Sequence, residues 1–93
     1  MSLNGKVIVV TGGGSGIGAA AALHFASEGA RVVISGRRLD ALASVAAKNK
    51  NILAVQGDAA VDADLERLKS ETLKAFGHID GVFLNAGYEG AGK

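Results

Sequence analysis

Residues 6–18 read KVIVVTGGGSGIG, and this stretch decides the fold. Its first part, residues 6–11, is apolar and rich in β-branched residues, which is typical of a strand buried on both faces of a parallel sheet. Five glycines then fall within seven residues, and a helix is expected over 15–28. A strand, a glycine-rich turn and a helix in this order predict the start of a βαβ unit.

The remaining elements are predicted from the same kinds of pattern. Further strands are expected over 31–35, 52–56 and 79–84, and further helices over 39–48 and 62–75. Apolar faces are expected at Ile17, Ala21 and Phe25 in the first helix, at Leu39, Leu42, Ala43 and Ala46 in the second, and at Leu65, Leu68, Thr72 and Phe76 in the third. Gly29 and Gly77 are the expected C-terminal stops of the first and third helices.

The alternation β-α-β-α-β-α-β at short spacing implies right-handed crossovers and a parallel sheet. The predicted class is therefore α/β: a Rossmann-like half-domain with strand order 3-2-1-4 and helices on both faces. One domain is expected over 1–87, followed by a glycine-rich tail over 88–93. Ligands of such sheets bind at the carboxyl ends of the strands, beside the switch point between the first and fourth strands.

Composition excludes several classes of function. A chain of 93 residues that is 48% hydrophobic and 20% charged is one globular domain, and a net charge of +1 does not suggest a nucleic-acid partner. Without cysteine there are no disulfides or thiolate metal sites, and His24 and His78 have no partners at ligand spacing, so no metal is expected. The apolar stretches are too short for a membrane span and the first residues are too polar for a signal peptide, so we expect no membrane partner and a cytoplasmic location.

The glycine-rich turn has the features that a phosphate requires: backbone N–H donors, no Cβ atoms in the way and a positive helix end. Gly12 suits the sharp turn, Gly16 the close approach to a pyrophosphate, and Gly18 the tight packing of helix on strand. The predicted pyrophosphate site comprises Gly12, Gly14, Ser15, Gly16, Ile17 and Gly18. The residues alone leave open a tight turn that binds no ligand.

The pattern Thr-Gly-x-x-x-Gly-x-Gly at 11–18 resembles the short-chain dehydrogenase/reductase family, as does the lead-in Leu-Asn-Gly-Lys-Val at 3–7. The resemblance extends along the whole chain, which corresponds to the N-terminal portion of such an enzyme. It implies the part of an oxidoreductase that binds a nicotinamide dinucleotide.

The end of the second strand indicates which dinucleotide is bound. The order there is Ser35-Gly36-Arg37-Arg38, with no carboxylate before Asp40 to accept a ribose 2′-hydroxyl. Two guanidiniums suit the 2′-phosphate of NADP, with NAD as the alternative. We expect Arg37 on the 2′-phosphate with the Ser35 hydroxyl beside it, and Arg38 on that phosphate or stacked on the adenine. Solvated arginines at a helix start are the other interpretation.

Asp58 follows the third strand, and Gly57-Asp58 resembles the family's adenine-contacting aspartate, with the Ala59 backbone beside it. Helix capping by Asp58 or Asp62 is the alternative. The family often has a hydroxyl residue two positions after the aspartate, where this chain has Ala60.

Asn85, Ala86 and Gly87 match the family's Asn-Ala-Gly motif at the end of the fourth strand. The resemblance implies that the Asn braces adjacent strands and that the small residues admit the nicotinamide-side ribose. An ordinary turn is the alternative. Asp80, at the start of that strand, is expected to have a structural role.

The family transfers hydride with a Tyr-x-x-x-Lys pair, and here Tyr88 is followed four residues later by Gly92. No catalytic residue can therefore be assigned. Three hypotheses remain: an NADP(H)-binding half that does not transfer hydride alone, a complete oxidoreductase site assembled with another chain, and a structural half-fold without useful cofactor affinity.

The fourth strand is expected to be an uncovered apolar edge, formed by Ile79, Val82, Phe83 and Leu84. Such an edge pairs readily with another chain. We therefore expect a homo-oligomer, most simply a two-fold dimer joined at these edges.

Overall fold

Seven elements alternate along the chain in the computed structural model, which describes residues 2–12, 14, 16–58 and 60–85. The strands are β1 (Val7–Thr11), β2 (Arg31–Gly36), β3 (Ile52–Gln56) and β4 (Gly81–Leu84). The helices are α1 (Gly16–Ser27), α2 (Leu39–Ala46) and α3 (Asp62–Phe76). The predicted type and order of all seven elements are confirmed.

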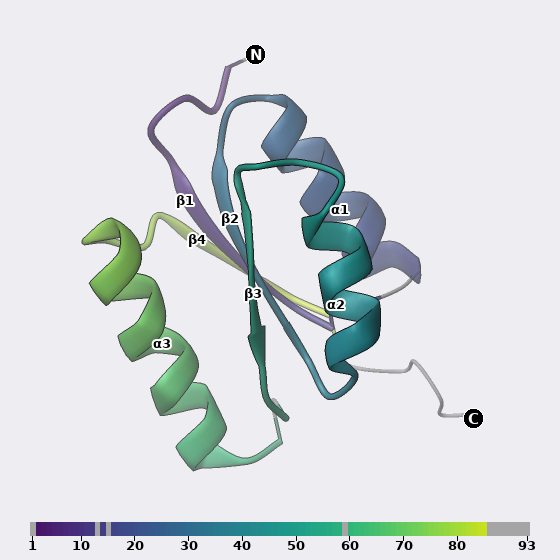
Figure 1. Ribbon diagram of the computed structural model, residues 1–93. Coiled ribbons are helices and arrows are strands. Elements are labelled where there is room, and N and C mark those ends of the chain that lie inside the picture. Colours follow the sequence, from purple (N-terminus) through teal and green to yellow (C-terminus); the bar gives the residue numbers. More distant parts are fainter. Residues whose placement is uncertain (1, 13, 15, 59, 86–93) are drawn as a thin grey trace.

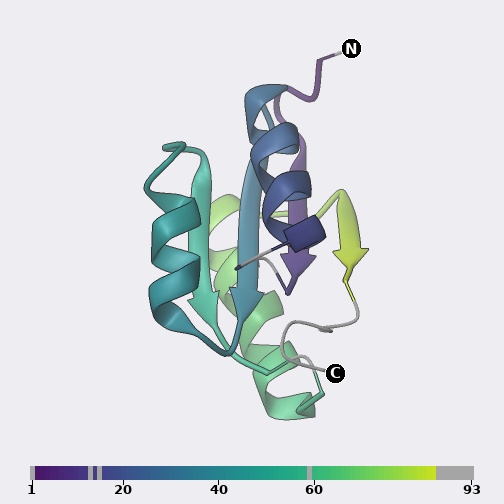
Figure 2. The same cartoon turned by 90° about the vertical axis from the view of Figure 1, so that its right-hand side faces the viewer.

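The four strands form one parallel sheet in the order β3-β2-β1-β4, as predicted. Val9 in β1 lies opposite Val33 in β2 and Val82 in β4. Helices α1 and α2 cover one face of the sheet and α3 covers the other (Figure 1). Seen from the side, β4 is the outermost strand on the side away from β3 (Figure 2).

The core lies mainly between the sheet and the α1–α2 layer. Val10, Val32 and Ile34 on the strands are fully buried there, because β-branched side chains pack densely on a pleated surface. The smaller cluster under α3 is built by Val9, Val33 and Leu68.

The predicted apolar face of α1 is wrong by one position. Ile17 is 71% exposed, and the buried residues of the helix are Gly18, Ala22 and Ala26. These small residues let the helix axis approach the sheet closely, whereas larger side chains remain at the border. One of them, Phe25, is half-buried and packs edge-on against Phe83 of β4, with ring centroids 6.2 Å apart.

The predicted faces of the other two helices are partly wrong. Leu42 of α2 is buried as predicted, but Leu39 is 51% exposed and Val45 takes its place in the core. With only eight residues, α2 presents about one large side chain per turn to the sheet. In α3, Leu68 and Thr72 are buried as predicted, whereas Leu65 is exposed.

The start of β4 is held by Asp80 rather than by strand pairing, and β4 begins two residues later than predicted. The Asp80 N–H donates to the Val7 carbonyl, and the Asp80 carboxylate accepts the Val7 N–H, both at 2.8 Å. The bond from the Val7 N–H to the carboxylate lowers the pKa of Asp80 below its ordinary value, and His78, 3.0 Å away, lowers it further. The expected structural role of Asp80 thus has a physical basis.

Two glycines end helices as predicted, since Gly29 and Gly77 both have left-handed backbones, with φ of 98° and 85°. No helix in the described part of the chain is long and apolar enough to cross a bilayer. The tail predicted over 88–93 lies outside the described residues.

Candidate functional site

The carboxyl ends of all four strands meet at one edge of the sheet, because the strands are parallel. The residues that follow β1, β2, β3 and β4 are therefore gathered there, although they are far apart in the sequence. This carboxyl edge contains every described residue that the sequence places in the site. Ser15, Ala59, Ala86 and Gly87 lie outside the described residues.

The glycine-rich turn leads from β1 into the N-terminus of α1. Gly12 and Gly16 have φ of 66° and 59°, which L side chains rarely adopt. A Cβ added at Gly16 would meet nothing within 4 Å, so the backbone here faces open space. The first N–H groups of α1 have no partner within the helix and give its N-terminus a partial positive charge.

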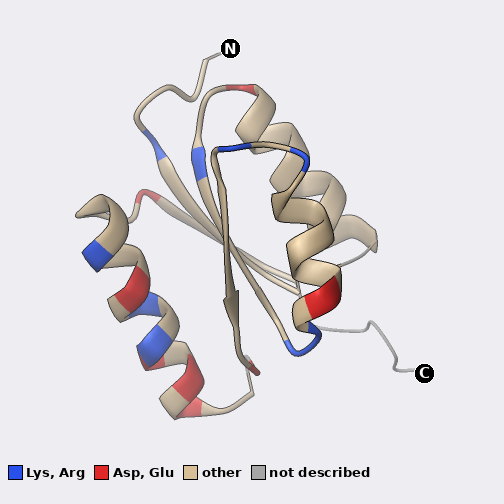
Figure 3. Ribbon diagram, in the orientation of Figure 1, with Lys and Arg blue, Asp and Glu red and all other residues tan. Residues whose placement is uncertain are grey.

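No charged side chain of α1 opposes this partial charge. The helix contains no Lys, Arg, Asp or Glu, in contrast to α3, which carries charges of both signs (Figure 3). The N-terminus of α1 is thus suited to an anion such as a pyrophosphate.

Gly18 and Asn85 hold the turn against the sheet. A Cβ added at Gly18 would collide with the Gly12 carbonyl and come within 2.8 Å of Asn85 Nδ2. Asn85 Nδ2 donates to that carbonyl at 3.2 Å. The Asn85 N–H also donates to Thr11 Oγ1 at 3.1 Å, and the Thr11 hydroxyl is 3.2 Å from the Asn85 carbonyl. Asn85 therefore braces the end of β4 against β1, as the resemblance implied.

Gly14 brings the turn close to α2. A Cβ added there would lie 3.1 Å from the Cβ of Ala41, so a side chain would crowd the second helix. Gly14 is thus packed against α2.

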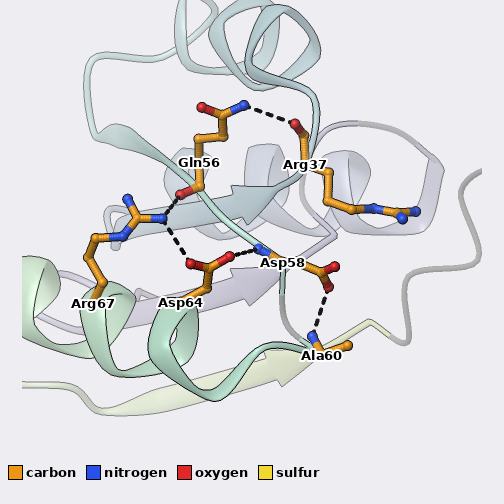
Figure 4. Close-up of polar contacts among 6 residues, drawn as sticks. All are labelled: Arg37, Gln56, Asp58, Ala60, Asp64 and Arg67. Carbon is orange, nitrogen blue, oxygen red and sulfur yellow. Dashed lines mark hydrogen bonds and ion pairs between the residues drawn. The ribbon is translucent and has the colours of Figure 1, made fainter.

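Arg37 and Asp58, predicted independently from two strand ends, lie together. They line an open depression of ≈ 240 Å³ with four further residues: Gln56, Gly57, Asp64 and Arg67. Within the part of the chain that the structure describes, the Arg37 guanidinium makes no ion pair. Its side chain extends away from Gln56 in Figure 4.

The neighbouring Arg38 is placed differently. Its guanidinium lies 3.3 Å from Asp40, and both side chains are about three-quarters exposed. The pKa of Asp40 is lowered chiefly by the Ala41 N–H and further by Arg38. The negative charge of Asp40, the first carboxylate after β2, is thus compensated by the positive charge of Arg38. Ser35 is 4% exposed, which leaves little of this residue accessible to a ligand.

Asp58 does not cap α3. Its Oδ1 accepts the Ala60 N–H at 2.9 Å, while the N-cap residue, Val61, makes no side-chain capping bond. Capping by Asp58 or Asp62 is therefore wrong. The bond to Ala60 instead fixes the Asp58 carboxylate beside the depression (Figure 4).

Three lining residues were missed by the sequence analysis: Gln56, Asp64 and Arg67. The available signal was the i,i+3 spacing of Asp64 and Arg67 in the first turns of the helix after β3. That spacing alone predicts a surface ion pair, and only the fold shows that the two side chains lie at the site.

A second hollow, of ≈ 510 Å³, lies at the opposite edge of the sheet, where the strands begin and α3 ends. It is larger, but ligands of open parallel sheets bind at the carboxyl edge, and the glycine-rich turn is there. Among the described residues there is no group of three His, Cys, Asp or Glu side chains that could hold a metal ion.

Sheet order, glycine-rich turn and switch point together define a Rossmann-type fold of the class that binds dinucleotides. The family model for short chain dehydrogenases matches residues 6–93, and the chain belongs to this family.

Relatives and solved structures agree with this assignment. The glucose 1-dehydrogenase of Gluconobacter oxydans is 41% identical over 90 residues, which cover 91% of this chain and 34% of that protein. A short chain dehydrogenase from Bacillus anthracis superposes with a TM-score of 0.84 at 38% identity, over 88% of this chain and 35% of that one. The 3-ketoacyl-(acyl-carrier-protein) reductase from Brucella melitensis, solved in complex with NADH, superposes with a TM-score of 0.84 at 39% identity. The match covers 87% of this chain and 34% of that one. The chain spans about a third of the length of these relatives.

Replacing Gly18 with Ala tests the packing of the turn. Alanine adds about 1 kcal/mol of helix propensity, but its Cβ meets a backbone carbonyl that cannot move freely. We expect Gly18→Ala to lower the free energy of unfolding by about 1–3 kcal/mol, measured by urea titration.

The matched control is Gly81→Ala, where an added Cβ meets nothing within 4 Å. If the two variants unfold at the same urea concentration, the contact between Gly18 and Gly12 does not determine how the turn is packed.

Proposed function

We propose that this chain binds NADP(H) as the N-terminal, cofactor-binding part of an oxidoreductase of its family. The observation that carries the proposal is the position of Arg37. Arg37 lines the same depression as Asp58, and its guanidinium makes no ion pair within the described residues. The chain has no carboxylate at the end of β2 that would repel a 2′-phosphate, since Asp40 is paired with Arg38.

The pyrophosphate would be held by the turn and the N-terminus of α1. The open space beside Gly16 and its left-handed backbone supply a cradle that a side chain would fill. The N–H groups from Gly16 to Gly18 are the donors available to the anion. The residues present therefore fit a dinucleotide.

The adenosine end would lie along the depression at the ends of β2 and β3. Arg37 would bind the 2′-phosphate through charged hydrogen bonds, and the Asp58 carboxylate would accept a bond from the adenine amino group. NADP rather than NAD is proposed because a guanidinium gains most from the two additional negative charges of the 2′-phosphate.

The nicotinamide end would lie near Asn85, at the switch point between β1 and β4. When bound, the nicotinamide ring supplies a hydride or accepts one. The role proposed for Asn85 is to hold the turn and β4 together, and the resemblance implies that Ala86 and Gly87 would admit the ribose. No residue of this chain is proposed as catalytic.

Arg37→Ala should weaken NADPH binding about tenfold and NADH binding much less, because only NADPH has the 2′-phosphate that the guanidinium would bind. Calorimetric titration of both cofactors measures the difference. Lys48→Ala, which removes an equal charge just beyond the C-terminal end of α2, is the control and should change both affinities little.

Equal losses for the two cofactors would remove the 2′-phosphate role of Arg37. If neither cofactor binds the unmodified protein below millimolar concentration, the proposed function itself is wrong.

We also propose that two copies of the chain pair through β4. In the described part of the chain no strand lies beyond β4, while Val82 and Leu84 are 55% and 74% exposed. The residues of β4, Gly81–Leu84, carry no charge, so nothing in the strand repels a second copy of the same edge. A two-fold axis perpendicular to β4 would pair the two copies antiparallel and make their hydrogen bonds equivalent.

Light scattering after size-exclusion chromatography should give a dimer mass for the unmodified protein and a monomer mass for Val82→Lys, because a lysine on an edge strand blocks pairing. Leu53→Lys is the matched control on β3, the opposite edge, and should remain dimeric. A monomer at micromolar concentration for the unmodified protein contradicts the proposal, as does dissociation by Leu53→Lys alone.

A further inference from the structure

A series of hydrogen bonds connects α3 with the ends of β3 and β2 (Figure 4). Arg67 Nη2 donates to the Gln56 carbonyl and lies 3.5 Å from Asp64 Oδ1. Asp64 Oδ2 accepts the Asp58 N–H at 2.8 Å. The Gln56 side chain then donates through Nε2 to the Arg37 carbonyl at 3.1 Å. Arg37 and Asp58, which follow different strands, are therefore both connected to one ion pair on α3.

These bonds satisfy backbone groups that the sheet leaves open. The Gly57 N–H donates to the Gly36 carbonyl of β2. Because successive backbone groups of an extended chain point in opposite directions, the Gln56 carbonyl and the Asp58 N–H point away from β2, to the open side of β3. The Gln56 carbonyl and the Asp58 N–H on that side are bonded by Arg67 and Asp64. The ion pair thus takes the place of a neighbouring strand at the point where the site begins.

The start of α3 is also connected to Asp58 by one backbone bond, since the Val61 N–H donates to the Asp58 carbonyl at 2.9 Å. Its N-cap residue, Val61, makes no side-chain capping bond, and its buried side chains, Leu68 and Thr72, lie beyond the first turn. Gly57 permits the close approach, since a Cβ there would lie 3.2 Å from Arg67 Nη2 and 3.3 Å from the Asp64 Cβ. The Asp64–Arg67 pair is therefore well placed to fix the start of α3 on the end of β3.

We propose that Asp64 and Arg67 are positioning residues that hold Arg37 and Asp58 at the spacing that favours NADPH over NADH. This inference rests on the proposed function, because it takes Arg37 and Asp58 to face the adenosine end of the cofactor. Asp64 and Arg67 act through hydrogen bonds to the backbone, without touching the cofactor. Their opposite charges compensate each other, which leaves Arg37 to attract the 2′-phosphate.

Two substitutions of Asp64 separate hydrogen bonding from charge. Asp64→Ala and Asp64→Asn remove the same negative charge, but only Asn keeps an oxygen that accepts the Asp58 N–H. In the protein without ligand, hydrogen exchange of the Asp58 amide, followed by NMR, should be roughly tenfold faster in Asp64→Ala and within about threefold of the unmodified rate in Asp64→Asn.

Cofactor titrations of the same variants test the effect on selection. The ratio of the NADH and NADPH dissociation constants should fall roughly three- to tenfold in Asp64→Ala and stay near the unmodified value in Asp64→Asn. Arg67→Ala should behave as Asp64→Ala does. Lys69→Ala, which removes an equal charge from the same helix, should leave the ratio unchanged.

Loss of the preference in Asp64→Asn as well would overturn the positioning role in favour of charge. Unchanged Asp58 exchange in Asp64→Ala would overturn it outright. If the unmodified protein binds neither cofactor, the proposed function and the role in selection both fail, whereas the exchange measurement still decides whether Asp64 fixes the end of β3.

Discussion

The close contact between Gly18 of α1 and the carbonyl of Gly12 is the constraint on which the rest of the structure depends. No side chain fits between helix and turn at this point, and Asn85 Nδ2 bonds the same carbonyl from β4. One backbone group thus joins the first strand, the first helix and the fourth strand. As a result the N-terminus of α1, whose first N–H groups have no partner within the helix, is directed at the switch point of the sheet.

The small buried face of α1 extends this constraint along the helix. Because Ala22 and Ala26 continue the line of Gly18, the helix lies flat on the strands, and Phe25 reaches β4 at the border. The core is therefore compact on this side of the sheet. On the α3 side, Val82 and Leu84 remain exposed, and so the two faces of β4 are covered unequally.

Much of this arrangement can be predicted from the sequence, because buried parallel strands, and glycines at turns and helix ends, can be identified within short stretches of the chain. The strand order follows from the alternation of elements and the handedness of crossovers. The buried faces of the helices were harder to predict: Ile17 has the right spacing and chemistry for a core residue, yet the small residues beside it decide which face packs. Burial in a close contact favours the residue that fits rather than the most apolar one.

The candidate site likewise contains residues that could be predicted from the sequence and residues that could not. Arg37 and Asp58 could be predicted because each follows a strand, and the carboxyl edge collects such residues. Asp64 and Arg67 could not, since their role depends on backbone groups at an open strand edge, which no pattern in the sequence reveals. Long-range hydrogen bonds to the main chain are specified by the fold, and side-chain spacing alone does not identify them.

We propose above all that the carboxyl edge binds a dinucleotide with its pyrophosphate on the glycine-rich turn. Amide chemical shifts recorded by NMR during titration with NADPH test it most directly. The largest changes are expected at Gly12, Gly16, Gly18 and Asp58. Changes confined to Asn51 and the other residues around the hollow at the opposite edge, or no change at saturating cofactor, would contradict it.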